Sequence, residues 1–581
     1  MNKKVIKLIA FCMAVVLMIF LPGLFNLGFT LYLDITMKAT GKLPTVNTEK
    51  KLEKLVGDRN IDYYYDYSPI SVSRPITGSK VPVDFFNTVS SVDSLSSNMS
   101  FLDSTIFESS KSVSSDYSAT NIQVVGVDEA DILKNDGKYI YMIANDKLVI
   151  VEAFPQETMR KVSEIKIENG YRAIDLYVSG NKLFLVTDNN SYSSNIETKI
   201  LVFNITNRNN PTVIKTFEFT GAYSSSRMIG EKIYVFSNMG IRRSGGEITL
   251  PKYRENDVSY FKEVSLKDVQ YVPNDDYTSF TQIFVFDLAM LNNLPKIVTY
   301  LGSSAKDTYM SRDNLYMAQG RYNETTVYKF ELDSLYPRFV AKGTVPGNII
   351  NQFAMDEYNG NFRIATTKNN VNAVYILSQS MHRLGAVENI ARGEQIKSVR
   401  FEGERGYVVT FRNTDPLFVL DLSKVRAPKI LGELKIPGYS TYLHTYDENH
   451  VMGFGYDGTE WGTNGNLKLA LFDITDVTSP KEKFVEVIDS RTSELLTNHK
   501  SLLFSKDKDL IAFSSGNYRE SKVGKVYTVN LEDGFTLRGE IKHTSDVNRM
   551  LYMDDILYGV SDKNVSAHDI NSVKELNKIE I

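Results

Sequence analysis

The chain has 581 residues, 42% of them apolar, and a formal net charge of −4. The absence of excess positive charge argues against nucleic acid as a partner. The single cysteine, Cys12, excludes an internal disulfide and a thiolate metal site. The 34 tyrosines and 31 phenylalanines favour β-structure over coiled coil.

The N-terminus carries an uncharged run over residues 8–33, preceded by Lys3, Lys4 and Lys7. An α-helix needs about 20 apolar residues to cross the hydrocarbon core, so the run is long enough. We expect residues 1–34 to form an uncleaved signal anchor in the cell membrane, with the rest of the chain outside. A cleaved signal peptide is the alternative, which would leave the protein secreted. No A-x-A-like cleavage site stands near Gly28 or Thr30.

Residues 35–117 are predicted to form a polar, partly disordered stalk. The stretch 90–118 is rich in Ser and Asp, and such a composition buries too little apolar surface to offset chain entropy. A short helix is expected over 49–56. The tyrosine-rich patch 60–67 has two further interpretations, a contact for a partner or a segment packed on the outside of the domain.

The folded domain is expected to begin at residue 118 and to run to 581. An acidic cluster in VVGVDEAD is followed by Asn135-Asp136-Gly137 and then by the apolar run 139–143. An Asp-Gly pair between two apolar runs predicts a hairpin, because Gly and Asp tolerate the positive φ of a tight turn.

From residue 131 onward a four-strand unit recurs, and its third strand is the clearest. The expected third strands are 199–204, 282–287, 326–331, 373–377, 416–421, 469–473 and 525–530. Most spacings fall at roughly 40 to 57 residues, which is typical of propeller blades. The strands are too many for a β-sandwich. We therefore predict an all-β propeller of about eight four-stranded blades, with seven to nine compatible with the pattern, and terminal strands sharing one blade.

One long insertion interrupts the pattern at 239–278. It carries basic and acidic residues together, without one charge preference. Loops of this length inside compact domains are often functional or disordered, so the insertion is a candidate contact surface.

Two stretches resemble signatures of a known family. The first joins TNIQV at 120–124 to VDEADI at 127–132, Lys134 and Asp136-Gly137. The second is LKLALFDITD at 467–476 followed by Ser479-Pro480, with residues 453–465 as its preceding loop. Both resemble secreted bacterial and archaeal proteins with a C-terminal β-propeller domain, distantly related to tryptophan–aspartate repeats. The resemblance covers roughly 118–581 and implies export and a propeller, but no catalytic residues.

The acidic cluster Asp128, Glu129 and Asp131 is a candidate metal site. Closely spaced carboxylates are ligands that Ca²⁺ prefers. The cluster lacks the D-x-[DN]-x-[DN]-G pattern, and its side chains would alternatively satisfy backbone amides or basic residues where the chain enters the ring. No other cofactor is expected.

A glycine-rich loop over 455–465 holds Asp457, Glu460 and the only tryptophan, Trp461. An aromatic residue on a propeller rim can stack on a ligand or anchor a partner, so these three are candidate ligand-binding residues. The alternative is that Trp461 folds back and caps a blade.

No catalytic residues are predicted. There is no G-x-S-x-G elbow, phosphate-cradling loop or H-E-x-x-H motif. The histidines are scattered, at His382, His444, His450, His499, His543 and His568. His444, Asp447 and His450 are close in sequence, but across a strand turn their side chains need not converge.

The sequence therefore favours a membrane-tethered extracellular propeller that binds a protein or a cell-envelope polymer through rim loops. The alternative is an exported hydrolase that acts on envelope material at the channel mouth. A carboxylate pair about 5 to 9 Å apart in a deep pocket would favour glycosidic chemistry.

Overall fold

The computed structural model describes residues 43–57, 114–189, 196–256, 258–333, 337–411, 415–459 and 462–581. The predicted membrane segment 1–34 lies outside these ranges, as does most of the predicted stalk. Among the described residues, no helix is long and apolar enough to span a bilayer.

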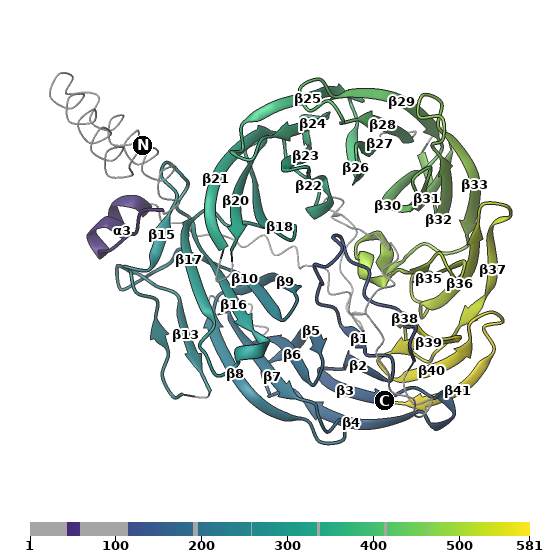
Figure 1. The fold of residues 1–581 in the computed structure, drawn as a ribbon, viewed down its shortest axis with the longest axis horizontal. Coiled ribbons are helices and arrows are strands. Elements are labelled where there is room, and N and C mark those ends of the chain that lie inside the picture. Colours follow the sequence, from purple (N-terminus) through teal and green to yellow (C-terminus); the bar gives the residue numbers. More distant parts are fainter. Residues whose placement is uncertain are drawn as a thin grey trace, which may run out of the picture.

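The described residues form nine four-stranded antiparallel blades arranged in a ring (Figure 1). The first three blades are built from β1 (Leu133–Asn135), β2 (Tyr139–Ala144), β3 (Lys147–Glu152) and β4 (Arg160–Lys166); β5 (Arg172–Ser179), β6 (Lys182–Asp188), β7 (Glu197–Asn204) and β8 (Thr212–Thr220); and β9 (Ala222–Ile229), β10 (Lys232–Gly240), β16 (Ser279–Asp287) and β17 (Lys296–Gly302).

Blades 4 to 6 continue without interruption. They comprise β18 (Asp307–Met310), β19 (Asn314–Arg321), β20 (Glu324–Leu332) and β21 (Pro337–Pro346); β22 (Met355–Tyr358), β23 (Asn361–Lys368), β24 (Val371–Leu377) and β25 (Arg383–Ile390); and β26 (Gln395–Glu402), β27 (Arg405–Phe411), β28 (Asp415–Asp421) and β29 (Lys429–Ile436).

Blades 7 to 9 complete the ring. They comprise β30 (Tyr439–Asp447), β31 (His450–Thr459), β32 (Gly462–Asp473) and β33 (Lys481–Ile488); β34 (Leu503–Ser505), β35 (Leu510–Ser515), β36 (Val523–Asn530) and β37 (Gly534–Ile541); and β38 (Val547–Met553), β39 (Ile556–Ser561), β40 (Asn564–Asp569) and β41 (Glu575–Glu580). Short 3₁₀ helices occupy several connections: η2 (Gln156–Thr158), η3 (Leu288–Met290), η4 (Gln352–Ala354), η5 (Glu494–Leu496) and η6 (His499–Ser501).

The burial of each strand follows its place in the blade. Middle strands such as β6 and β16 are buried at almost every position, because neighbouring blades cover both faces of the sheet. Outer strands such as β4 and β33 alternate between covered and exposed residues. Aromatic rings join the blades, as where Phe217 of blade 2 lies 5.5 Å from Phe284 of blade 3 between ring centroids. All seven predicted third strands are confirmed as β7, β16, β20, β24, β28, β32 and β36.

The ring has nine blades, at the upper end of the predicted range of seven to nine. The prediction that the terminal strands share a blade is wrong. Blades 1 and 9 are each made from one continuous stretch of chain. They close the ring by packing, with the Tyr558 hydroxyl donating to the Ala153 carbonyl at 2.9 Å. A shared strand is unnecessary because both end blades already have four strands.

The hairpin predicted at Asp136-Gly137 is confirmed. Strands β1 and β2 pair antiparallel, with Leu133 opposite Met142. Gly137 has φ of +82°, and the Asp136 carboxylate accepts from the Tyr139 amide at 2.8 Å. A Cβ at residue 137 would stand 2.7 Å from the Ser114 carbonyl oxygen, so this turn also needs glycine for the close approach of the incoming chain.

The insertion between β10 and β16 is structured. It contains β11 (Arg243–Ser244), β12 (Glu247–Ile248), β13 (Lys252–Glu255), β14 (Lys262–Glu263) and β15 (Val269–Tyr271). Strand β13 pairs with β8 and widens blade 2, while β15 pairs in parallel with β17 at the outer edge of blade 3.

Part of the predicted stalk packs on this insertion. The expected helix is confirmed as α3 (Glu49–Val56), with Thr48 capping its N-terminus. Leu52 and Val56 are buried in a cluster with Val269 and Tyr271, and the Val46 amide donates to the Val269 carbonyl at 2.9 Å. Residues 43–57 of the predicted stalk are therefore an ordered part that packs on the domain. The i, i+4 spacing of Leu52 and Val56 gives the helix one apolar face to bury.

Candidate functional site

Residues 114–132, which we call the belt, run along the inner wall of the ring before entering blade 1 (Figure 1). Tyr117 forms a β-bridge with Met553 of blade 9. The side-chain Nδ2 of Asn121 donates to the Tyr442 hydroxyl of blade 7 at 3.2 Å and to the His499 carbonyl at 3.1 Å.

The belt then continues past lower-numbered blades. The Gln123 side chain donates to the Met355 carbonyl of blade 5 at 3.3 Å. Val125 accepts from Arg312 of blade 4 at 3.1 Å, and Asp128 forms a β-bridge with Met228 of blade 3. Asp131 bridges in the same way to Leu176 of blade 2. The stretch 120–132, which carries the first family signature, thus contacts several blades from inside the ring.

A second segment, from the C-terminal part of the sequence, also lies in the channel. Residues 489–502, which we call the channel loop, connect β33 to β34 and contain η5 and η6. The central part of Figure 1 shows this loop beside the belt. Ion pairs join the belt and the channel loop to inner strands of the blades.

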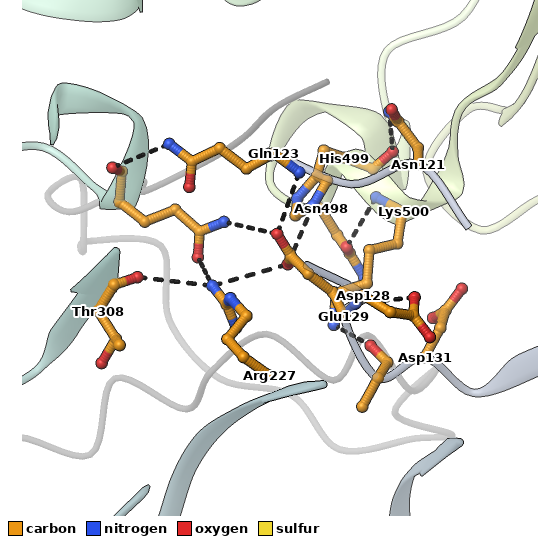
Figure 2. A network of polar contacts seen from close by, with 12 residues as sticks. Asn121, Gln123, Asp128, Glu129, Asp131, Arg227, Thr308, Asn498, His499 and Lys500 are labelled. Atoms are coloured by element: carbon orange, nitrogen blue, oxygen red, sulfur yellow. Dashed lines mark hydrogen bonds and ion pairs between the residues drawn. The ribbon is translucent and has the colours of Figure 1, made fainter. Parts of the chain in front are cut away.

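Glu129 is the centre of the first ion-pair group (Figure 2). Its side chain is 3% exposed, and its Oε2 lies 3.7 Å from Arg227 Nη2 and 3.3 Å from His499 Nε2. Its Oε1 accepts from the Gln123 amide at 3.2 Å and from the Gln352 side chain at 3.4 Å. Hydrogen bonds from the belt and from η4 therefore hold the carboxylate, with Arg227 and His499 within ion-pair distance.

The charges in this group follow from burial and pairing. Burial alone would raise the pKa of Glu129, but the Arg227 charge and His499 override it and hold that pKa well below its usual range. Burial lowers the pKa of His499 despite the attraction of Glu129. At neutral pH we therefore assign an ionised Glu129 beside a neutral imidazole.

Asp131 belongs to a second group, around Arg549 of β38. Arg549 Nη2 lies 3.0 Å from Asp131 Oδ1 and its Nε lies 3.1 Å from Asp131 Oδ2, while Nη1 lies 2.7 Å from Glu494 Oε2. All three side chains are less than one-tenth exposed. Arg549 thus joins the belt, the channel loop and blade 9. Burial disfavours the charged form of Asp131, but the Arg549 charge outweighs this and lowers the pKa of Asp131.

The third acidic residue of the motif, Asp128, is paired nearby. Its Oδ1 lies 2.8 Å from Lys134 Nζ. The predicted metal-site residues Asp128, Glu129 and Asp131 each face a cation in this way. Among the described residues, no group of three His, Cys, Asp or Glu side chains is placed to hold a metal ion. The Ca²⁺ hypothesis stays a prediction of the sequence.

A melting experiment tests that hypothesis. We expect the melting temperature to be the same in EDTA as in CaCl₂, because Lys134, Arg227 and Arg549 already balance the three carboxylates. A lower melting temperature in EDTA, with that sensitivity lost in Asp131→Ala, would instead establish a structural Ca²⁺ ion.

The other predicted site residues lie elsewhere. Strands β31 and β32 extend as a hairpin with Gly458 opposite Thr463, and Asp457 is half-buried near its base. Glu460 and Trp461, at the tip, lie outside the described residues. Asp457 belongs to the hairpin of blade 7, whereas Glu129 and Asp131 lie within the channel near Lys500.

Among the described histidines, only His499 forms an ion pair with an acidic residue of the channel, Glu129. His450 Nδ1 lies 2.8 Å from Asp447 Oδ1, while His444 Nδ1 bonds the Tyr442 hydroxyl at 2.9 Å. The sequence analysis did not identify Arg227 or Arg549, and it did not pair His499 with the acidic motif, because each is far from the belt along the chain and none stands in a recognisable motif.

Comparisons with known proteins agree with this architecture. The model of the family described as beta propeller domain matches residues 117–573. An uncharacterised protein of Archaeoglobus fulgidus is 30% identical over 556 residues, covering 80% of this chain and 85% of its own. One of Methanocaldococcus jannaschii is 27% identical over 555 residues, covering 80% and 83%.

Solved structures are similar at lower identity. Apo AztD from Citrobacter koseri matches with 10% identity over 78% of this chain and 95% of its own, with a TM-score of 0.35. Sqt1 from Chaetomium thermophilum matches with 12% identity over 60% and 84%, with a TM-score of 0.38. The WD40 domain of a Toxoplasma gondii coronin matches with 14% identity over 47% and 67%, with a TM-score of 0.32.

Proposed function

Because the chain belongs to the beta propeller domain family, we propose that it is a binding or scaffolding module. Its ligand is a protein or a cell-envelope polymer, recognised at the rim of the ring. The engagement of the channel acids in ion pairs supports surface recognition over chemistry in the channel. In this proposal, the uncharged run at 8–33 tethers the propeller to the outer side of the cell membrane, or is cleaved to release it.

One observation carries the proposal, an exposed apolar surface at the outer edge of blades 2 and 3. We call it the edge patch, and its residues are Val213, Ile214, Val258, Tyr260, Met290 and Leu294. Tyr260 is 71% exposed and Met290 is 56% exposed. Single exposed apolar residues are ordinary, whereas a contiguous group marks an interaction site.

The contacts of Lys215 bring together the segments that carry the edge patch. Its ammonium pairs with Glu255 of β13 and donates to the carbonyls of Leu291 and Asn293, both at 2.7 Å. The connection 288–295 is thereby fixed to the outer strand of blade 2. The Asn256 amide donates to the Thr216 carbonyl at 3.0 Å, which places the turn holding Val258 and Tyr260 at the same edge.

We propose the hairpin of Asp457, Glu460 and Trp461 as a second contact on the rim. Its support is that β31 and β32 stay paired with each other beyond the last pair of β31 with β30, out to Thr459 opposite Gly462. A tryptophan on a rim loop suits a partner that offers an apolar pocket or a flat sugar face.

Crosslinking on intact producing cells, followed by affinity capture, tests the function. The variants are Tyr260→Ser with Met290→Ser for the edge patch and Trp461→Ala for the hairpin. Truncating an interface anchor costs about 2 kcal/mol or more, so we expect capture to weaken roughly 30-fold. Tyr518→Ser is the matched control, since Tyr518 is 70% exposed on blade 8.

Equal capture by wild type and both variants would show that neither surface is the contact. If the wild-type protein captures no specific partner, the exported-hydrolase alternative is favoured. That alternative predicts release of soluble fragments from isolated envelopes.

A further inference from the structure

A cleft of about 360 Å³ opens between blades 3 and 4, on the face where β9 turns into β10. Its apolar lining is formed by Ile229, Tyr234 and Leu332, which belong to or pack against the core between these blades. The volume is at the lower end of the range of roughly 300 to 1,000 Å³ typical of ligand pockets. The volume suits a small ligand, and the apolar lining suits a ligand that carries one apolar group.

Charges of both signs line the same cleft. Arg312 and Lys232 supply positive charge, and Glu231, Asp287 and Asp333 supply negative charge. Glu231 is about half exposed and its closest described cation, Lys182, is 3.9 Å away. A ligand of one charge sign would meet repulsion from part of this lining, whereas a ligand with both signs would be matched.

Arg312 is held in place by the belt. Its Nε donates to the Val125 carbonyl at 3.1 Å, and a Cβ at Gly126 would stand 2.7 Å from Nη2. Gly126 also has φ of +83°, so only glycine suits this position. Within the described ranges, no carboxylate forms an ion pair with Arg312. The hydrogen bond of Nε therefore orients the guanidinium and leaves its two Nη groups for a ligand. A planar guanidinium binds a carboxylate through two parallel hydrogen bonds.

We propose that this cleft binds a zwitterionic α-amino acid or dipeptide. Its carboxylate would lie on Arg312, its ammonium on Glu231 and Asp287, and its apolar side chain against Tyr234 and Leu332. The cleft shares no residue with the edge patch, although Ala289 and Met290 are neighbours in η3, and the proposal does not depend on a macromolecule binding to the patch. It also gives the belt a second role, because the belt orients the arginine that recognises the ligand.

Calorimetric titration of the full chain tests the site. The probes are phenylalanine and the dipeptide Ala-Phe, with N-acetyl-Ala-Phe and Ala-Phe amide as blocked analogues. We expect a Kd on the order of 0.1 to 1 mM for at least one zwitterion. Each blocked analogue should bind about 10- to 100-fold more weakly, because it lacks one charged hydrogen-bonding group.

Two variants and a control locate the binding. Arg312→Gln should weaken it about 10- to 100-fold. Ala289→Trp should abolish it by filling the cleft from an exposed position while Arg312 is retained. Arg392→Gln, at an exposed arginine on blade 5, should bind as the wild type does. No binding of either zwitterion, equal binding of the blocked analogues, or unchanged binding in Ala289→Trp would each overturn the proposal.

Discussion

Replacing Arg549 by methionine is expected to lower the free energy of unfolding by about 3 to 5 kcal/mol. The change removes the cation shared by Asp131 and Glu494 and leaves two buried carboxylates without it. Their desolvation is then no longer compensated, which costs more than the loss of an exposed pair. Urea denaturation followed by circular dichroism measures the loss.

Two comparisons make this result specific. Arg392→Met, at an exposed arginine, should change the unfolding free energy by less than about 0.5 kcal/mol. Adding Asp131→Asn and Glu494→Gln to the Arg549→Met chain should recover part of the stability, since the buried charges are then removed. A loss below about 1 kcal/mol in Arg549→Met would show that the ion pairs do not hold the belt.

Acid is expected to destabilise the fold through buried neutral histidines, with His543 as the clearest case. His543 bonds the Ser561 and Ser566 hydroxyls at 2.8 and 2.7 Å. Burial, aided by the charges of Lys578 and His568, lowers the pKa of His543 to about 4. The folded pKa lies below the unfolded value of about 6.5, so the stabilisation is complete above pH 6.5 and is lost as the pH falls toward 4.

The expected loss from His543 alone is on the order of 1 to 2 kcal/mol at pH 5, because the partial exposure of the ring screens the charges that lower its pKa. Urea midpoints at pH 7.5 and pH 5 measure it. His543→Gln should show a smaller difference between the two pH values than the wild type, and the exposed His382→Gln should show the same difference. An unchanged pH dependence in His543→Gln would contradict the assignment.

The blades were predictable because their signal is local. The third strands alternate or concentrate β-branched and aromatic residues within a few positions, as in Gln282 to Asp287, and turn residues bound them. The exact blade number is harder to predict. The repeat pattern is compatible with seven to nine blades, and propellers of roughly four to eight blades are usual, so about eight is expected where the structure has nine.

The role of the acidic motif was only partly predictable. Its three carboxylates suggested either a metal or basic partners, and the structure supplies Arg227 and Arg549 from strands far along the chain. Asp131 and Arg549 are separated by 418 residues. No spacing rule links residues at that distance, so only the closed ring shows which cations meet the motif. The packing of α3 on the insertion was hidden for the same reason, although the helix itself was predicted from local pattern.

The path of the belt has a consequence for how the protein is made. Ser118 is bonded to Tyr552, which follows it by 434 residues in the chain. At about 5 to 20 residues per second, the ribosome adds that length in roughly 20 to 90 s. Throughout that time the belt has emerged but its last docking partner has not. A nascent chain that stops early leaves Glu129 without His499 and Asp131 without Arg549. Docking of the belt thus distinguishes finished molecules from truncated ones, which remain open to proteases.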